Sequence, residues 1–142
     1  MVDPFNLHCF VDAQAPVIDA VRSELRDGRK RTHWMWFIFP QLQALGRSAT
    51  ALLYGIRSLD EARAYLEHPL LGARLAECTE LVCAIQGRTV HEIFGSPDDL
   101  KFHSSMTLFA SAGPDEAVFA KAVHQYFDGQ WDSRTQGLLR VG

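Results

Sequence analysis

The chain has 142 residues, a formal net charge of −3 and 47% hydrophobic residues. This composition is typical of one soluble globular domain, which we expect to span residues 1–142. The charge lacks the basic surplus of most nucleic-acid-binding proteins, and no apolar run approaches the ~20 residues of a membrane span. The N-terminus has no basic segment of the secretory type, so a cytoplasmic location is expected.

The cysteine and histidine patterns argue against a disulfide framework and against a metal site. The three cysteines, Cys9, Cys78 and Cys83, are odd in number and form no CxxC pair, which fits a reducing cytoplasm. The six histidines form no HxxxH or HExxH motif. A P-loop, a GxGxxG loop and a GxSxG elbow are also absent. We therefore expect neither a metal nor a cofactor.

Helix start and stop signals recur along the chain. Ser58 and Glu61 have the spacing of a capping box, in which each side chain bonds the other's backbone amide, and Thr89 repeats it with Glu92. The strongest start signal is Ser96, which precedes a proline and two carboxylates. The signals and the apolar spacing predict helical segments over residues 16–27, 58–67, 69–87, 89–95, 96–113, 114–127 and 132–139, the first with Pro16 in its opening turn and the last capped by Asp132.

The stretch from Trp34 to Phe39 fits neither the helical nor the strand period, because its apolar residues fall on every side. Residue propensity favours a buried strand, but no other β-rich run exists to pair with it. We interpret it as a fully buried helical segment that ends at Pro40. The predicted fold is therefore all-α, a single compact domain of about seven or eight helices of mixed length.

The first candidate site is the junction of cations and aromatic residues. Residues 29–31 are Arg, Lys and Arg, and they run directly into Trp34 and Trp36. Cations beside a helix start suit an anion, and tryptophan rings stack on a flat ligand such as a nucleobase or nicotinamide. His33 lies between them and is our candidate catalytic base. The alternative is a solvated loop, a hydrogen-bonded histidine and two tryptophans that fill the core.

The second candidate site is the segment 100–112, in which hydroxyl groups interrupt an apolar helix. At helical spacing Lys101, Ser104 and Ser105 lie on one side of the predicted helix. Phe102 and Met106 lie on a different, apolar side. Serine and threonine inside a helix either bond back to the carbonyl four residues earlier or meet a partner. The segment therefore either satisfies its own hydroxyls or lines a polar pocket that holds phosphate or ribose.

Long motifs in these regions resemble a known family. The segments GRKRTHWMWFIFPQL, YGIRSLDEARAYLEHPLLGARL, EIFGSPDDLKFHSSMTLFA and YFDGQWDSRT are similar to the bacterial domain-of-unknown-function family 1810, over roughly residues 5–139. The resemblance implies a mainly α-helical single domain and no established activity. Its motifs map onto Lys30, His33, Trp34, Trp36, Phe39, Gln41, Tyr54, Lys101, Ser104, Ser105 and Met106. A more distant similarity is to the NAD- and ADP-ribose-associated family of small helical N-glycosidases, from which no residue is carried over.

Two hypotheses follow. In the first, the chain binds a small phosphate-bearing molecule, either a nucleotide or a phosphorylated sugar. This hypothesis extends to hydrolytic N-glycosidase-type activity on an ADP-ribose-like compound. Its proposed residues are His33 as catalytic group and Lys30, Arg31, Trp34, Trp36, Gln41, Tyr54, Lys101, Ser104 and Ser105 as ligand-binding groups. In the second, a non-enzymatic helical module uses the same basic edge to bind an acidic protein or RNA segment. A homo-oligomer formed through an amphipathic face is compatible with either.

Overall fold

The computed structural model describes residues 3–141, except for the side chain of Val141. Within that range the chain is all-α, as predicted, and its only β pairing is an isolated bridge between Leu42 and Ile56. The elements are α1 (His8–Gln14), α2 (Ile18–Arg26), α3 (Met35–Ile38), the 3-10 turn η1 (Gln43–Leu45), α4 (Ala49–Leu53), α5 (Leu59–Glu67), α6 (Leu71–Ala84), α7 (Val90–Phe94), α8 (Asp98–Ala112), α9 (Ala117–Phe127) and α10 (Ser133–Val141).

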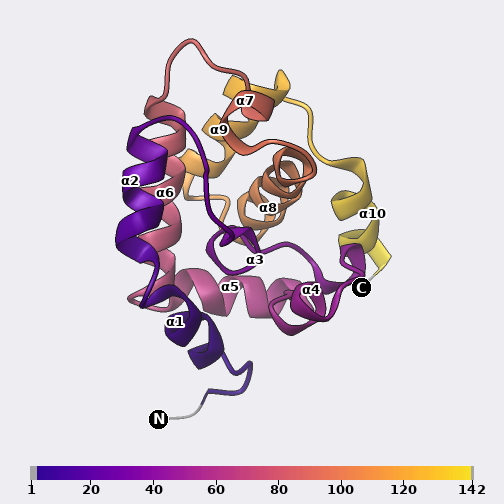
Figure 1. The fold of residues 1–142 in the computed structure, drawn as a ribbon. Coiled ribbons are helices and arrows are strands. Elements are labelled where there is room, and N and C mark those ends of the chain that lie inside the picture. The colour runs from indigo at the N-terminus through magenta and orange to yellow at the C-terminus, as the bar shows by residue number, and fades with distance from the viewer. Residues whose placement is uncertain (1–2, 142) are drawn as a thin grey trace.

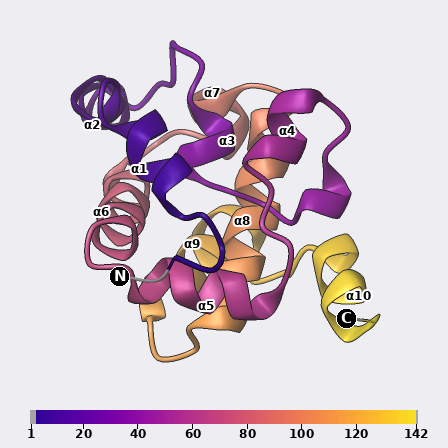
Figure 2. The ribbon, with the colours of Figure 1, turned by 90° about the horizontal axis from the view of Figure 1, so that it is seen from below.

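Helix α8 is the centre of the fold. The helices α5, α7, α9 and α10 pack around it, while α2 and α6 lie side by side at one flank (Figures 1 and 2). Its apolar face is fully buried, and the ring of Phe102 lies 5.0 Å from that of Phe39 and 4.8 Å from that of Phe94. These aromatic contacts connect α3, α7 and α8, so the two segments proposed as sites are held by one core.

The predicted aromatic segment is helical but only partly buried. Helix α3 covers Met35–Ile38 and ends before Pro40, as expected. Trp34 and Phe39 are core side chains, whereas Trp36 and Phe37 are half-exposed. The prediction of full burial was wrong because a single short helix at the edge of the core turns one side outward.

The two capping boxes differ in outcome. Thr89 and Glu92 form the complete box at the start of α7. Ser58 accepts a hydrogen bond from the Glu61 amide at 3.1 Å, but the Glu61 carboxylate accepts from Arg57 Nε at 3.1 Å. Glu61 is buried, and a buried carboxylate is stabilised more by a cation than by one amide. Only half of that predicted box therefore forms.

The structure corrects two helix starts and adds short elements. Ser96 makes no capping bond, and the residue before α8 is Pro97. Pro16 lies in the turn before α2, two residues ahead of its first residue Ile18. The sequence also missed α1, η1 and α4. Ser48 caps the start of α4, because its hydroxyl accepts a hydrogen bond from the Ala51 amide at 3.0 Å.

Candidate functional site

Buried Glu24 explains how the basic run joins the aromatic segment. Its carboxylate accepts hydrogen bonds from the amides of Arg31 and Thr32 at 2.6 and 2.9 Å, and from Trp34 Nε1 at 3.1 Å. The Thr32 hydroxyl donates to its second oxygen at 2.6 Å. Burial alone would raise the pKa of Glu24, but these four hydrogen bonds outweigh it and hold the pKa below the ordinary value. The sequence reasoning missed Glu24, which folds the loop around itself.

The two candidate segments meet at Asp98. Its carboxylate lies 2.9 Å from Lys30 Nζ and 3.6 Å from Lys101 Nζ. The Lys30 ammonium lies 5.2 Å from the ring centre of Trp34, and that of Lys101 lies 5.1 Å from the ring centre of Trp36. Each lysine therefore has both a carboxylate and an aromatic face as partners.

Four of the predicted site residues line one narrow slot. Trp36, Gln41, Tyr54 and Lys101 surround it, between α3, α4 and the first turn of α8. The slot has a volume of about 10 Å³, which is about the space of one water molecule. A nucleotide therefore does not fit between these side chains as they stand.

The other predicted residues lie in different surroundings. Trp34 is 1% exposed, and its ring packs in the core. Arg31 makes an exposed ion pair with Asp27 at 3.0 Å. His33 is exposed and makes no hydrogen bond or ion pair to any residue from 3 to 141. Ser105 is fully buried, with a hydroxyl that has no partner among the described residues.

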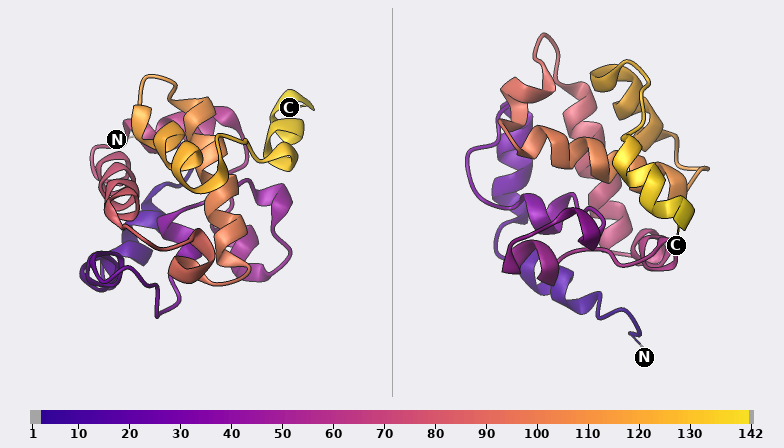
Figure 3. Two further views of the ribbon diagram at one scale, coloured as in Figure 1. Left: turned by 90° about the horizontal axis from the view of Figure 1, so that it is seen from above. Right: turned by 90° about the vertical axis from the view of Figure 1, so that its right-hand side faces the viewer.

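The hydroxyls of α8 fasten α10 to the core. The Ser104 hydroxyl lies 3.1 Å from both the carbonyl of Leu100 and the carboxylate of Asp132. Thr107 donates to the His103 carbonyl and accepts from the Asp132 amide at 3.0 Å. Asp132 also accepts from the amide and hydroxyl of Thr135 and thereby caps α10, as predicted. These contacts attach α10 at the edge of the molecule seen in Figure 3.

A cationic cleft lies between the loop after α2 and helix α7. Its volume is about 390 Å³, and it is lined by Arg29, Lys30, Arg88, His91, Glu92, Ile93, Phe94 and Gly95. Gly28 has a φ of +79°, and a β-carbon on it would lie 3.3 Å from Arg88 Nε. Arg88 therefore lies against the turn that carries Arg29 and Lys30, although almost 60 residues separate them.

The cleft contains two exposed guanidinium groups. Arg29 and Arg88 are exposed, and neither makes an ion pair with any residue from 3 to 141. Lys30 is tied to Asp98. The one lining carboxylate, Glu92, is held by the Thr89 amide at 2.8 Å in the capping box. Arg88 also borders a second hollow of about 540 Å³, which extends to Ile85, Val90, Gln125 and Tyr126.

His91 is the histidine of the cleft, and a carboxylate lies beside its ring. Its Nδ1 lies 3.2 Å from Asp99 Oδ2, while most of its side chain is exposed. A carboxylate on one ring nitrogen orients the imidazole and leaves Nε2 to exchange a proton. The sequence reasoning missed this pair, because neither residue stands in a recognised motif.

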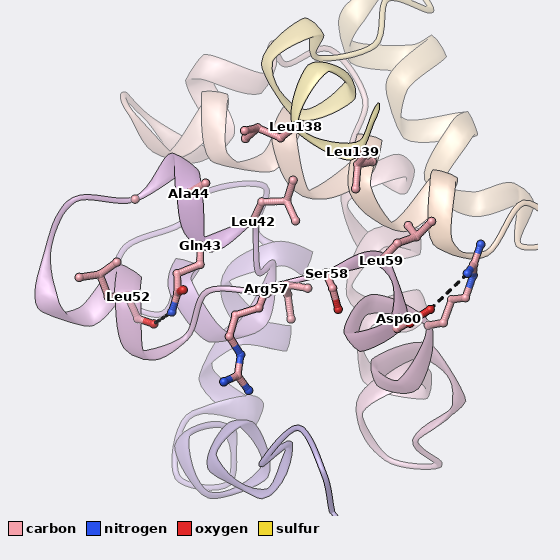
Figure 4. Close-up of a pocket in the computed structure, with 13 residues that line it drawn as sticks. Leu42, Gln43, Ala44, Leu52, Arg57, Ser58, Leu59, Asp60, Leu138 and Leu139 are labelled. Atoms are coloured by element: carbon pink, nitrogen blue, oxygen red, sulfur yellow. Dashed lines mark hydrogen bonds and ion pairs between the residues drawn. The ribbon is translucent and has the colours of Figure 1, made fainter. Parts of the chain in front are cut away.

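A larger hollow than the cationic cleft lies elsewhere, between α10, α5 and the segment 42–52. Its volume is about 700 Å³. Leu42, Leu59, Leu138 and Leu139 form its aliphatic walls in Figure 4, and charged groups of α5 stand at its edge. No residue lines both this hollow and the cationic cleft, so the two are separate.

Two classes of site are absent from the described residues. Nowhere between residues 3 and 141 do three or more histidine, cysteine, aspartate or glutamate side chains gather as a metal would need. The helices of that range are also too short or too polar to cross a membrane.

The comparisons with known proteins agree with the all-α architecture. The family model described as "Protein of unknown function (DUF1810)" matches residues 4–139. The chain belongs to the DUF1810 family. It is also similar to the crystal structure of the conserved hypothetical protein Rv1873 from Mycobacterium tuberculosis, with 58% identity and a TM-score of 0.97 over 99% of this chain and 100% of that one. No curated protein matches it. The family resemblance seen in the sequence is thus confirmed.

Proposed function

We propose that this DUF1810 protein binds a small phosphate-bearing molecule, such as a nucleotide or phosphorylated sugar, in the cationic cleft. The observation that carries the proposal is that Arg29 and Arg88, unpaired within residues 3–141, line the same hollow of about 390 Å³ as Lys30 and His91. A guanidinium group presents a planar fork of donors that matches phosphate oxygens. The ligand's phosphate would therefore replace solvent between the two arginines.

The shape of the cleft favours a small ligand over a macromolecule. The basic groups line a hollow, whereas an acidic protein or an RNA segment is usually bound by a broad basic surface. The hollow beyond Arg88 offers Val90 and Tyr126 as walls for the sugar or base. The whole protein has a net charge of −3 and would repel anions. The local basic patch would therefore be the part of the surface that attracts them.

A hydrolytic step would use His91. Held by Asp99, it can take a proton from a water molecule that attacks an N-glycosidic bond, or return one to the leaving group. We extend the proposal to such cleavage of an ADP-ribose-like compound. His33, the candidate from the sequence, has no carboxylate partner among the described residues.

Titration calorimetry with pyrophosphate, ADP and ADP-ribose tests the proposal. Loss of one hydrogen-bonded cation costs about 1.5–3 kcal/mol, so Arg29→Ala and Arg88→Ala are each expected to weaken binding about 10- to 100-fold. Lys121→Ala, on an exposed part of α9 outside the cleft, is the matched control and should bind like the wild type. If no ligand binds, or if the control loses as much affinity, the proposal fails.

A further experiment distinguishes ligand binding in the cleft from binding in the slot. Lys101, Trp36, Gln41 and Tyr54 stay proposed ligand groups, because a phosphate near Lys101 would require only that the slot widen. If Lys101→Ala abolishes binding while Arg88→Ala does not, the ligand belongs to the slot. Product analysis with ADP-ribose and the His91→Gln variant then tests for cleavage.

We also propose a cytoplasmic location. Its three thiols are free, and two of them, Cys78 and Cys83, are buried among apolar groups. Free buried thiols are typical of proteins from a reducing compartment.

A further inference from the structure

The hollow of about 700 Å³ has the character of a site for an aliphatic chain. Six branched aliphatic side chains line it, and none of its lining residues is aromatic: Leu42, Leu52, Ile56, Leu59, Leu138 and Leu139. They come from three different parts of the chain, the 42–56 segment, the start of α5 and the end of α10 (Figure 4). Walls of this kind offer apolar area without a flat surface for stacking.

The apolar walls remain partly in water. Leu52 of α4 is 48% exposed and Leu138 of α10 is 38% exposed, and both line the hollow. The volume lies within the range of about 300–1,000 Å³ that small-molecule sites occupy. A ligand chain that enters would therefore gain by removing both its own surface and these leucines from water.

The charged groups at the edge favour an anionic head group. Two guanidinium groups, Arg57 and Arg63, line the hollow against one carboxylate, Asp60. Arg57 is held by buried Glu61. The pair between Arg63 and Asp60 is long, at 3.6 Å, and both side chains are at least half-exposed, so it is weak. Arg63 therefore keeps N–H groups that can bind the carboxylate of a ligand.

We propose that this hollow is a second ligand site, which binds the aliphatic chain of a free amphipathic carboxylate between α10 and the 42–59 segment, with the head group at Arg63. The site is independent of the cationic cleft, because the two share no residue. The chain lies against the leucines of both walls, and the carboxylate stays at the solvent edge. The occupant is thus a medium-chain or long-chain carboxylic acid.

A homologous series of ligands tests the chain-binding part. The full chain is titrated with hexanoate, octanoate and decanoate below their micelle concentrations. Each buried methylene contributes about 0.8 kcal/mol, so affinity should rise about fourfold per methylene until the hollow is full. Decyltrimethylammonium, which has the opposite charge, should bind more weakly than decanoate, and Arg63→Ala should remove that preference.

Two neighbouring leucines of α4 provide a matched pair of variants. Leu52 lines the hollow and Leu53 does not, although Leu53 is the more exposed, at 62%. Leu52→Asp should weaken decanoate binding at least tenfold, and Leu53→Asp should leave it unchanged. Leu138→Asp repeats the test from the wall formed by α10. Thermal melts show that each variant is folded.

Three results would overturn the inference. One is an affinity that does not depend on chain length. Another is equal loss of binding in the Leu52 and Leu53 variants. The third is a wild-type dimer that Leu138→Asp dissociates, because a second copy would then be the occupant. Arg88→Ala should bind decanoate normally, so failure of this site and failure of the phosphate site are distinguishable.

Discussion

Replacing Glu24 should be among the most damaging single changes in the loop between α2 and α3. The side chain is 6% exposed, and four donors converge on its carboxylate. In Glu24→Ala those donors lose their acceptor inside the fold. Each unsatisfied buried donor costs about 1–3 kcal/mol, but water can enter beside the backbone amides. We therefore expect a total loss of about 4 kcal/mol.

Glu24→Gln should lower the free energy of unfolding much less, because three of the four donors bind one carboxylate oxygen and only one binds the other. Oε1 accepts from the two amides and from Trp34, and an amide oxygen can take that place. Oε2 accepts only from the Thr32 hydroxyl, which can turn and accept a bond from the new NH₂ group instead. What remains is the difference between charged and neutral hydrogen bonds, about 1–2 kcal/mol.

The pH dependence gives the sharper comparison. Because the pKa of Glu24 is held below its ordinary value of 4.5, its stabilisation is present above that pH and is lost as the pH falls through the folded-state pKa. The difference between wild type and Glu24→Gln should therefore shrink as the pH is lowered from 7 to 3. Glutamine does not titrate, so the change belongs to the wild type.

Urea unfolding followed by tryptophan fluorescence measures these losses. With a slope of about 2 kcal/mol per M, Glu24→Ala should lower the midpoint by about 2 M. Glu77→Ala is the control, because Glu77 makes a partly exposed pair with Arg22, and its loss should cost about 1 kcal/mol. The reasoning is refuted if the two alanine variants are equally stable, or if the gap for Glu24→Gln is the same at every pH.

Three further predictions concern other contacts. Asp132→Ala removes the shared acceptor of α8 and α10 and should cost about 2 kcal/mol, with faster amide hydrogen exchange in α10 than in α6 as the specific readout. Asp98→Ala removes the carboxylate that pairs with the ammonium of Lys30, whose side chain is 8% exposed. We expect the free energy of unfolding, measured in urea, to fall by about 2–3 kcal/mol, and a smaller fall would mean that Lys30 reaches water. Burial raises the pKa of the Cys78 thiol to about 12, so Ellman's reagent should label Cys9 in the native protein and Cys78 only on unfolding; labelling of both at one rate would contradict the packing.

Much of the fold could be predicted because its signals are local. The Thr89–Glu92 box and the end of α8 at Gly113 depend on residues within one helical turn of each other. The same kind of signal failed at Glu61, where a buried carboxylate found Arg57 instead. Helix α4 was missed because five residues carry too little periodicity to be recognised.

The candidate sites were predictable only in part, because contacts between distant segments create them. The sequence pointed to Lys30 and Lys101 separately, and the fold brings both to Asp98. Nothing near Arg88 in the sequence indicates that it lies against Gly28. The leucines of the large hollow carry no signal of a site in the sequence, since helical spacing does not tell which apolar face stays uncovered.

The junction of cations and tryptophans now divides into two roles. Lys30 and Lys101 lie beside indole rings and share the carboxylate of Asp98, so each ammonium already has partners within the fold. Arg29 and Arg88 make no ion pair within residues 3–141, although Glu92 lines the same cleft, and Arg88 lies against Gly28 in the turn that bears Arg29. A cation that the fold positions but does not neutralise is the one available to an external anion. For this reason we propose a phosphate site between the arginines, and not at the more conspicuous aromatic segment.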